Sequence, residues 1–117
     1  MKGSNQRIYD LTFASIYPLY RAKIQRKSQN LVYLDQVITW LTGYDQASIQ
    51  KLADSQVSFE QFFNQAPKLN PKRKLITGSI CGIKLNQIDD SIVQNVRYLD
   101  KLVDEIAKGR AIEKILR

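Results

Sequence analysis

The chain of 117 residues contains no histidine, one cysteine and no long apolar run. Without histidine, Ser-His-Asp and Cys-His nucleophile systems, histidine acid–base chemistry and histidine metal sites are excluded. A single cysteine excludes zinc-finger and iron–sulfur spacings and any internal disulfide. We therefore predict no catalytic residue, no metal site and no cofactor, and we favour a protein that is not an enzyme.

The chain also lacks membrane and export signals. No stretch approaches the roughly 18 apolar residues of a membrane span, and the start MKGSNQRIYDL has no apolar core of a signal peptide. We expect a cytoplasmic protein with no membrane association. Its length suits one helical domain spanning residues 1–117, with residues 1–6 as a flexible N-terminus.

The whole chain carries a net charge of +7, and acidic residues are scarce in two of its segments. Residues 1–34 contain six basic residues and one acid, and residues 67–86 contain five basic residues and no acid. Residues 35–66, which lie between them, contain four acids and one base. Such a charge distribution suits an anionic partner, although the segments can also neutralise one another on folding.

Apolar residues recur at helical spacing almost throughout, which predicts an all-α fold. We expect a compact bundle of five or six short helices that cross at steep angles. A stripe of aromatic and aliphatic residues opens the chain. Because proline is tolerated in a first helical turn, the main first helix is expected from about Pro18 to Lys27. The stripe is read as core rather than as a base-stacking platform; it comprises Tyr9, Phe13, Tyr17, Tyr20 and Ile24.

Several helix ends have recognisable capping residues. Gly43 is expected to end a helix that runs from after Asn30 to Leu41, and Asp45 to begin the next. Ser58 and Gln61 have the spacing of a capping box. The last long helix is predicted to open at Asp89 or Asp90 and to stop at Gly109, followed by a terminal turn. Trp40 and Tyr44 are predicted to pack in the core or at a cap.

The segment APKLNPKRKLITGSICG, residues 66–82, concentrates unusual residues. It is predicted to form a helix with Asn70 as N-cap, Pro71 as first residue and a core-facing stripe of Leu75, Ile76, Ser79, Ile80 and Ile83. Cys81 has only Lys74 as a conceivable activating group, so it is predicted to be a buried apolar residue. Gly78 and Gly82 would share a face of this helix, against which another helix or a ligand would pack.

Three basic residues would fill the first turn of that helix, where the helix dipole disfavours cations. Such a turn is relieved by a bound anion. We therefore predict an anion site at Lys68, Asn70, Lys72, Arg73 and Lys74, the alternative being a solvated basic turn. A second basic patch, which could extend a nucleic-acid footprint, comprises Arg21, Lys23, Arg26 and Lys27. Asp100 and Asp104 on the last helix are interleaved with basic residues, and this pattern indicates surface ion pairs rather than a metal site.

Five blocks of the sequence, RIYDLTFASIYPLY, WLTGY, FFNQAPKLNPKRKLITGSICG, RYLDKLVDEIAKG and EKILR, are similar in order to a family of short bacterial proteins. The resemblance runs from about Arg7 to Leu116. That family is a domain of unknown function, and the resemblance implies an all-helical fold but no activity or cofactor. Ser91 stands where the family often has proline, which affects only the start of the last helix.

The favoured interpretation is a non-enzymatic module that binds a polyanion, most simply nucleic acid, through its phosphates. One alternative is a protein–protein interaction module or homodimer with an exposed apolar patch. The other is an enzyme that acts on a phosphorylated small molecule in a pocket at residues 70–74.

Overall fold

The computed structural model describes the backbone of residues 2–117 and the side chains of residues 5–117. These residues form an all-helical bundle with one small β-hairpin, as the sequence predicts for the fold class. The helices are α1 Lys2–Asp10, α2 Phe13–Arg26, α3 Val32–Thr42, α4 Gln46–Ala53, α5 Phe59–Asn64, α6 Ser91–Ala107 and α7 Ile112–Ile115. Between α5 and α6 lie two 3₁₀-helices, η1 Pro71–Leu75 and η2 Leu85–Gln87, and the strands β1 Ser79–Ile80 and β2 Ile83–Lys84.

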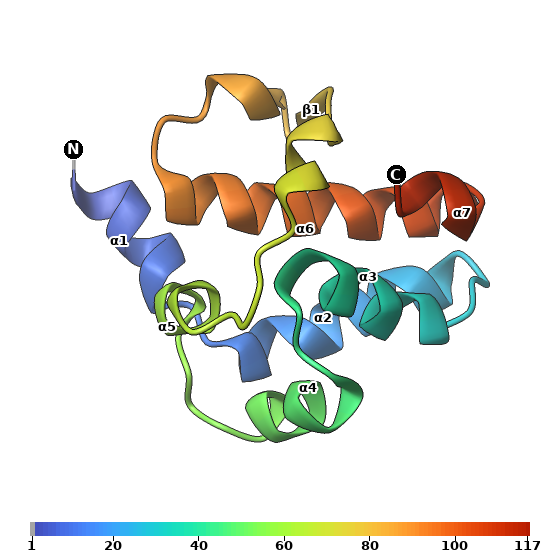
Figure 1. The fold of residues 1–117 in the computed structure, drawn as a ribbon, viewed down its shortest axis with the longest axis horizontal. Helices are drawn as coiled ribbons and strands as arrows, with labels where there is room; N and C mark the ends of the chain where they lie inside the picture. The colour runs from blue at the N-terminus through green and yellow to red at the C-terminus, as the bar shows by residue number, and fades with distance from the viewer. Residues whose placement is uncertain (1) are drawn as a thin grey trace.

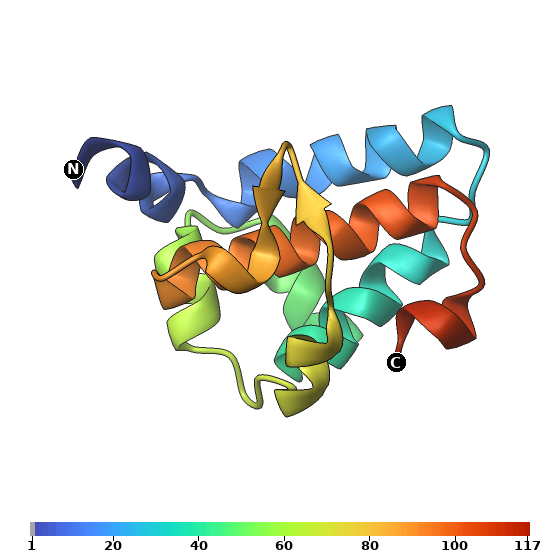
Figure 2. The ribbon, with the colours of Figure 1, turned by 90° about the horizontal axis from the view of Figure 1, so that it is seen from above.

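The longest helix, α6, is the centre of the bundle. It packs against α1, α2, α3, α5 and α7, and the hairpin and η2 also contact it. In Figure 1 the hairpin lies above α6, whereas α2 and α3 lie below it. The short helix α5 is seen nearly end-on in Figure 1 and upright in Figure 2, so it crosses α6 steeply.

The core is built from the helix stripes that the sequence predicts. Phe13, Tyr17, Tyr20 and Ile24 on α2 are all buried, and the inner face of α3 contributes Leu34, Val37, Ile38 and Leu41. Leu99 and Leu102 of α6 are fully buried between these helices. The aromatic stripe is therefore core, which confirms that interpretation for every member except Tyr9, which lies on α1 and is half-buried.

The predicted helix ends are confirmed where they depend on local hydrogen bonds. Asp45 accepts from the backbone N–H of Ser48 at 2.8 Å, and Asp90 accepts from that of Val93 at 3.0 Å. Ser58 and Gln61 form the predicted capping box. Each bond satisfies an N–H group that a helix start leaves without a partner, so these short motifs fix helix starts by themselves.

The helix α1 begins at Lys2, so the flexibility of residues 1–6 stays a prediction, and Met1 lies outside the described residues. One prediction for the N-terminal third is changed by the structure. The helix α2 begins at Phe13, not at Pro18, because Thr12 caps it and the N–H of Phe13 donates to the Val57 carbonyl at 3.0 Å. Pro18 is exposed, so water can satisfy the carbonyl that its missing N–H leaves unbonded.

The long helix predicted from Pro71 to Ile83 is wrong. Only residues 71–75 are helical, and β1 then pairs with β2 in an antiparallel hairpin with Ile80 opposite Ile83. Both turn residues have positive φ, +52° at Cys81 and +79° at Gly82, as a two-residue type I′ turn requires. The helix fails because the segment is rich in residues with poor helix propensity: Ile76, Thr77, Gly78, Ile80, Gly82 and Ile83.

The prediction that Cys81 is buried is therefore also wrong. It depended on the helix, and at the hairpin tip the side chain is exposed instead. The glycine face is likewise absent, because Gly78 lies in a bend with φ +91° and Gly82 lies in the hairpin turn. No described atom lies within 4 Å of a Cβ built on Gly82, so nothing packs closely there.

Candidate functional site

The outer face of α3, which points away from the core, carries several polar and apolar side chains that line one groove. Successive turns of the helix bring these side chains together along one side because residues three and four apart are neighbours. Val32 is 56% exposed even though it is apolar. The residues of this outer face are Val32, Asp35, Gln36, Thr39 and Trp40.

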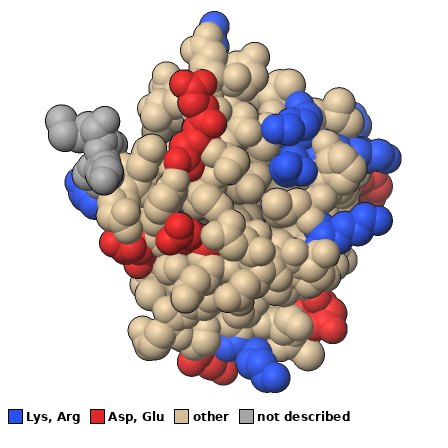
Figure 3. Space-filling view, turned by 60° about the vertical axis from the view of Figure 1, so that its left-hand side comes forward, with Lys and Arg blue, Asp and Glu red and all other residues tan. Residues whose placement is uncertain are grey.

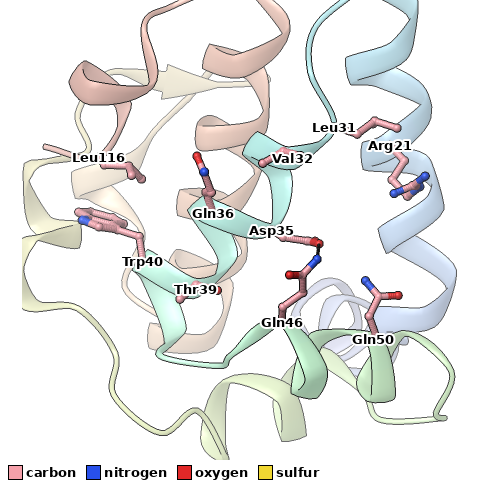
Figure 4. A pocket seen from close by; sticks show the side chains of 10 residues that line it. All are labelled: Arg21, Leu31, Val32, Asp35, Gln36, Thr39, Trp40, Gln46, Gln50 and Leu116. Carbon is pink, nitrogen blue, oxygen red and sulfur yellow. Dashed lines mark hydrogen bonds between the residues drawn. The ribbon is translucent and has the colours of Figure 1, made fainter.

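A groove of ≈ 700 Å³ runs over this outer face of α3. Neighbouring helices and the chain end close it: Arg21 comes from α2, Gln46 and Gln50 from α4, and Leu116 follows α7. Figure 4 shows Trp40 and Leu116 together at one end and Arg21 with Leu31 at the other. Gln36 and Gln46 lie between the two ends and Gln50 lies near Arg21 (Figure 4), so the groove combines apolar walls with hydrogen-bonding groups.

One wall of the groove carries a hydrogen-bonded network around Asp35. The Tyr17 hydroxyl donates to Asp35 Oδ1 at 2.5 Å, and Gln46 Nε2 donates to Asp35 Oδ2 at 3.5 Å. Gln50 Nε2 donates to the Tyr17 hydroxyl at 3.4 Å. Burial, followed by the hydrogen bond to Asp35, raises the pKa of Tyr17, so this hydroxyl stays protonated and remains a donor.

Arg21 supplies a positive charge at this end of the groove. Its guanidinium carbon lies 5.9 Å from the centre of the Tyr17 ring, within the range of a cation–π contact. Among the described residues Arg21 forms no ion pair. The guanidinium is therefore held beside Tyr17, and its positive charge is available to an anionic group in the groove.

A second pocket, of ≈ 340 Å³, adjoins the groove and is lined by Thr39, Trp40, Gly43, Lys68, Asn70, Pro71 and Lys72. Thr39 and Trp40 line both cavities. The structure thus brings three of the five predicted anion-site residues to one pocket. It also connects that pocket, through Trp40, with Arg21 of the second predicted patch.

The segment that carries these lysines is fixed to the end of α3. All of the last four carbonyls of this helix accept hydrogen bonds, as a buried helix end requires. Asn70 supplies two of the donors, and its side-chain oxygen also accepts from the N–H of Lys72 at 2.9 Å. The bonds are Gly43 N to Thr39 O at 2.8 Å, Asn70 Nδ2 to Trp40 O at 3.1 Å, Asn70 N to Leu41 O at 2.9 Å and Lys68 N to Thr42 O at 3.0 Å.

Replacing Gly43 with alanine is expected to lower the free energy of unfolding by about 2 kcal/mol. Gly43 has φ +81°, which costs a residue with a side chain about 1–2 kcal/mol. A Cβ there would also lie 2.9 Å from the backbone nitrogen of Lys68, so the segment would have to move. Gly82→Ala is the matched control because φ is similar and the space is open. Equal losses for the two variants in urea denaturation would show that the contact with Lys68 is unimportant.

The other two predicted anion-site residues point elsewhere. Arg73 Nη1 donates to the carbonyl of Asn70 at 3.0 Å, and Lys74 Nζ donates to Gln94 Oε1 on α6 at 3.3 Å. The predicted helix start is confirmed, since Asn70 caps η1, Pro71 is its first residue and three basic residues follow. Because η1 has only five residues, its dipole is small, and the lysines of the pocket also lie near the negative end of the α3 dipole, where cations are favoured.

The second basic patch is divided in the same way. Lys23 Nζ lies 3.2 Å from Asp104 Oδ1 on α6, and Arg26 and Lys27 are exposed and line neither the groove nor the second pocket. The ion pairs predicted on the last helix form, between Arg97 and Asp100 and between Lys108 and Asp104. Among the described side chains, no three acidic or cysteine residues gather closely enough to hold a metal ion.

Sequence reasoning missed the role of Trp40. Tyr44 is buried and its hydroxyl donates to the Phe62 carbonyl at 2.7 Å, which confirms core packing for that residue. Trp40 also packs against the core, as predicted, but it is only half-buried and lines both cavities. The signal was present in the sequence, because Val32, Gln36 and Trp40 repeat every four residues on the face opposite the core stripe.

Comparisons with known proteins give a family and a fold. Among curated proteins, none matches the chain. The crystal structure of the uncharacterized protein SP1917 is similar, with a TM-score of 0.89 and 41% identity over 95% of this chain and 91% of that one. None of the helices in residues 2–117 combines the length and apolar character needed to cross a membrane. The sequence profile of the uncharacterized proteins conserved in bacteria, DUF2200, matches residues 7–117, and the chain therefore belongs to this bacterial family.

Proposed function

We propose that this protein is a non-enzymatic binding module for nucleic acid, whose phosphates it contacts through Lys68 and Lys72. The observation that supports the proposal is the pocket in which these two lysines meet Trp40. Neither lysine forms an ion pair with a described residue. Their charges are therefore available to a ligand, while Asn70 holds the backbone between them in place.

An extended polyanion suits this surface better than a single phosphate group does. The pocket opens beside a groove whose far end carries another unpaired cation, Arg21. Charges elsewhere are unevenly spread. On the face shown in Figure 3, most Lys and Arg side chains gather on the right, and most Asp and Glu lie to the left and below. Such separation steers a polyanion toward one part of a protein surface.

The proposal predicts that a double charge reversal, Lys68→Glu with Lys72→Glu, weakens nucleic-acid binding at least about tenfold. Each lost phosphate contact removes about 0.7 from the slope of log affinity against log salt for a single strand, so the slope should fall by about 1.4. Fluorescence anisotropy with labelled single- and double-stranded DNA and RNA, across roughly 50–300 mM salt, measures both quantities.

The matched control reverses Lys51 and Lys84 to glutamate, which changes the net charge equally. Both residues are exposed, and neither lines the groove or the second pocket. This control should keep most of the affinity because separated surface charges are screened by salt. If both double variants lose affinity equally, the binding is diffuse and the pocket is not the phosphate site. If the unaltered protein binds none of the nucleic acids even at low salt, the proposed function is wrong.

A further inference from the structure

Trp40 occupies a special position in the proposed interface. It is the only tryptophan of the chain, and it is half-buried at the junction of the groove and the lysine pocket. Its carbonyl accepts from Asn70, so its backbone is tied to the segment that bears Lys68 and Lys72. An indole ring in such a place offers an apolar surface directly beside two cations.

We infer that the nucleic acid is bound as an unpaired strand, with one base in the groove against Trp40 and the flanking phosphates at Lys68 and Lys72 on one side and at Arg21 on the other. This inference rests on the proposed function and adds the class of nucleic acid to it. Single-strand binding sites combine positive charge along the backbone with aromatic side chains on which bases stack.

The size and lining of the groove suit a base. Its volume of ≈ 700 Å³ falls within the range of about 300–1,000 Å³ that is typical of ligand sites. Leu31, Val32 and Leu116 add apolar walls to the indole. A paired base inside a duplex cannot enter such a groove without leaving its stack, whereas the base of a single strand is already free.

The polar groups of the groove suit a base edge better than they suit a cation. Gln36 forms no hydrogen bond with another described residue, so its carboxamide can both donate to and accept from a base. The one carboxylate, Asp35, already accepts hydrogen bonds from Tyr17 and Gln46. These donors are neutral, so Asp35 keeps its negative charge and lies, like Arg21, away from the Trp40 end of the groove (Figure 4).

Charge complementarity argues for a strand rather than for a peptide or a second copy of the chain. Cations lie at both ends of the combined cavity. Between them lie apolar walls, carboxamides and the single carboxylate of Asp35, which accepts hydrogen bonds from Tyr17 and Gln46. A nucleic-acid strand has the matching sequence of groups, in which phosphates flank a neutral flat base. The aromatic face of Trp40 stacks with any base, so the inference predicts little sequence preference.

Intrinsic fluorescence tests the inference directly because Trp40 is the only indole. Oligothymidylate is titrated into the full chain, and an oligomer of the same length made of abasic deoxyribose phosphates serves as the matched probe. The inference predicts that oligothymidylate quenches Trp40 and binds about five-fold to a hundred-fold more tightly than the abasic oligomer. A duplex of the same length should bind more weakly than the single strand and without quenching.

The variant Trp40→Ala should reduce the affinity for oligothymidylate to that for the abasic oligomer, whereas Trp40→Phe should keep part of the difference. Because quenching and the abasic comparison need no variant, the test does not depend on whether Trp40→Ala folds. Equal, salt-dependent binding of all three probes without quenching would overturn the inference and leave the proposed function standing. If no probe binds, both fail, and a protein ligand for the groove should be sought.

Discussion

Replacing Phe62 with alanine is expected to lower the free energy of unfolding by about 3–5 kcal/mol, the usual loss for a fully buried phenylalanine. Phe62 is 0% exposed on α5, and its ring stacks on Phe13 of α2 with 4.4 Å between centroids. Tyr44 and Phe63 also contact the ring, each with centroids 5.0 Å away. Since domains of this size are stable by about 5–15 kcal/mol, the variant should lose a large share of its stability.

Urea denaturation followed by circular dichroism gives this loss as a shift of the midpoint at constant slope. Leu19→Ala is a suitable control because Leu19 lies on α2 and is 62% exposed. It should change the free energy of unfolding by no more than about 0.5 kcal/mol. A loss below about 1 kcal/mol for Phe62→Ala would mean that the aromatic cluster is not a close-packed part of the core.

The aromatic cluster was predictable because its members lie on helices whose period is visible in the sequence. Phe13 and Tyr17 are four residues apart on α2, and Phe59 and Phe62 three apart on α5. Helix starts were predictable for a similar reason. A capping residue such as Ser58 acts within three positions of itself, so its effect does not depend on the remainder of the fold.

The hairpin was not predictable from the same periodicity. Leu75, Ile76, Ser79, Ile80 and Ile83 have helical spacing, but short apolar segments fit either a helix or a strand. Cys81 and Gly82 form a turn that is usually signalled by Asn-Gly, and cysteine gives no such signal. Besides the poor helix propensity of the segment, the packing of β1 and η2 on α6 favours the hairpin, and periodicity does not reveal that packing.

The candidate site was only partly predictable because the sequence does not show which way each side chain of the short 3₁₀-helix η1 points. With three residues per turn, consecutive side chains such as those of Lys72, Arg73 and Lys74 point to different sides. Hydrogen bonds to α3 and α6 then decide which side faces the pocket. The groove itself requires α2, α4 and the chain end to meet over α3, and no local pattern encodes that meeting.

The end of the chain is held over the groove by the buried carboxylate of Glu105. Glu105 of α6 is 7% exposed. Its two oxygens accept from Arg117 Nη1 at 2.9 Å and Nη2 at 2.7 Å, and Oε2 also accepts from Arg110 Nη1 at 2.7 Å. A two-pronged arginine–carboxylate contact of this kind fixes geometry as well as charge. It therefore positions Leu116, the groove residue next to Arg117.

Replacing Glu105 with glutamine should lower the free energy of unfolding by about 3 kcal/mol, because Arg117 would stay largely buried without a counter-charge. The Arg117 side chain is 13% exposed, whereas that of Arg110 is 42% exposed. Water can therefore solvate the charge of Arg110 but hardly that of Arg117. With one buried charge left without a partner, the expected loss lies at the low end of the range for a broken buried ion pair. Glu113→Gln on α7 removes the same charge from an exposed position and should cost no more than about 0.5 kcal/mol.

Urea denaturation of both variants measures the difference, and similar small losses would show that the contact does not hold the chain end.

The contact between Glu105 and Arg117 also connects stability with the proposed site. When Arg117 is released, Leu116 no longer closes the groove beside Trp40, so the advantage of oligothymidylate over the abasic oligomer should shrink in Glu105→Gln. Binding of the abasic oligomer should stay unchanged because Lys68 and Lys72 are held by α3. A selective loss of this kind would separate the part of the site that takes the base from the part that takes the phosphates.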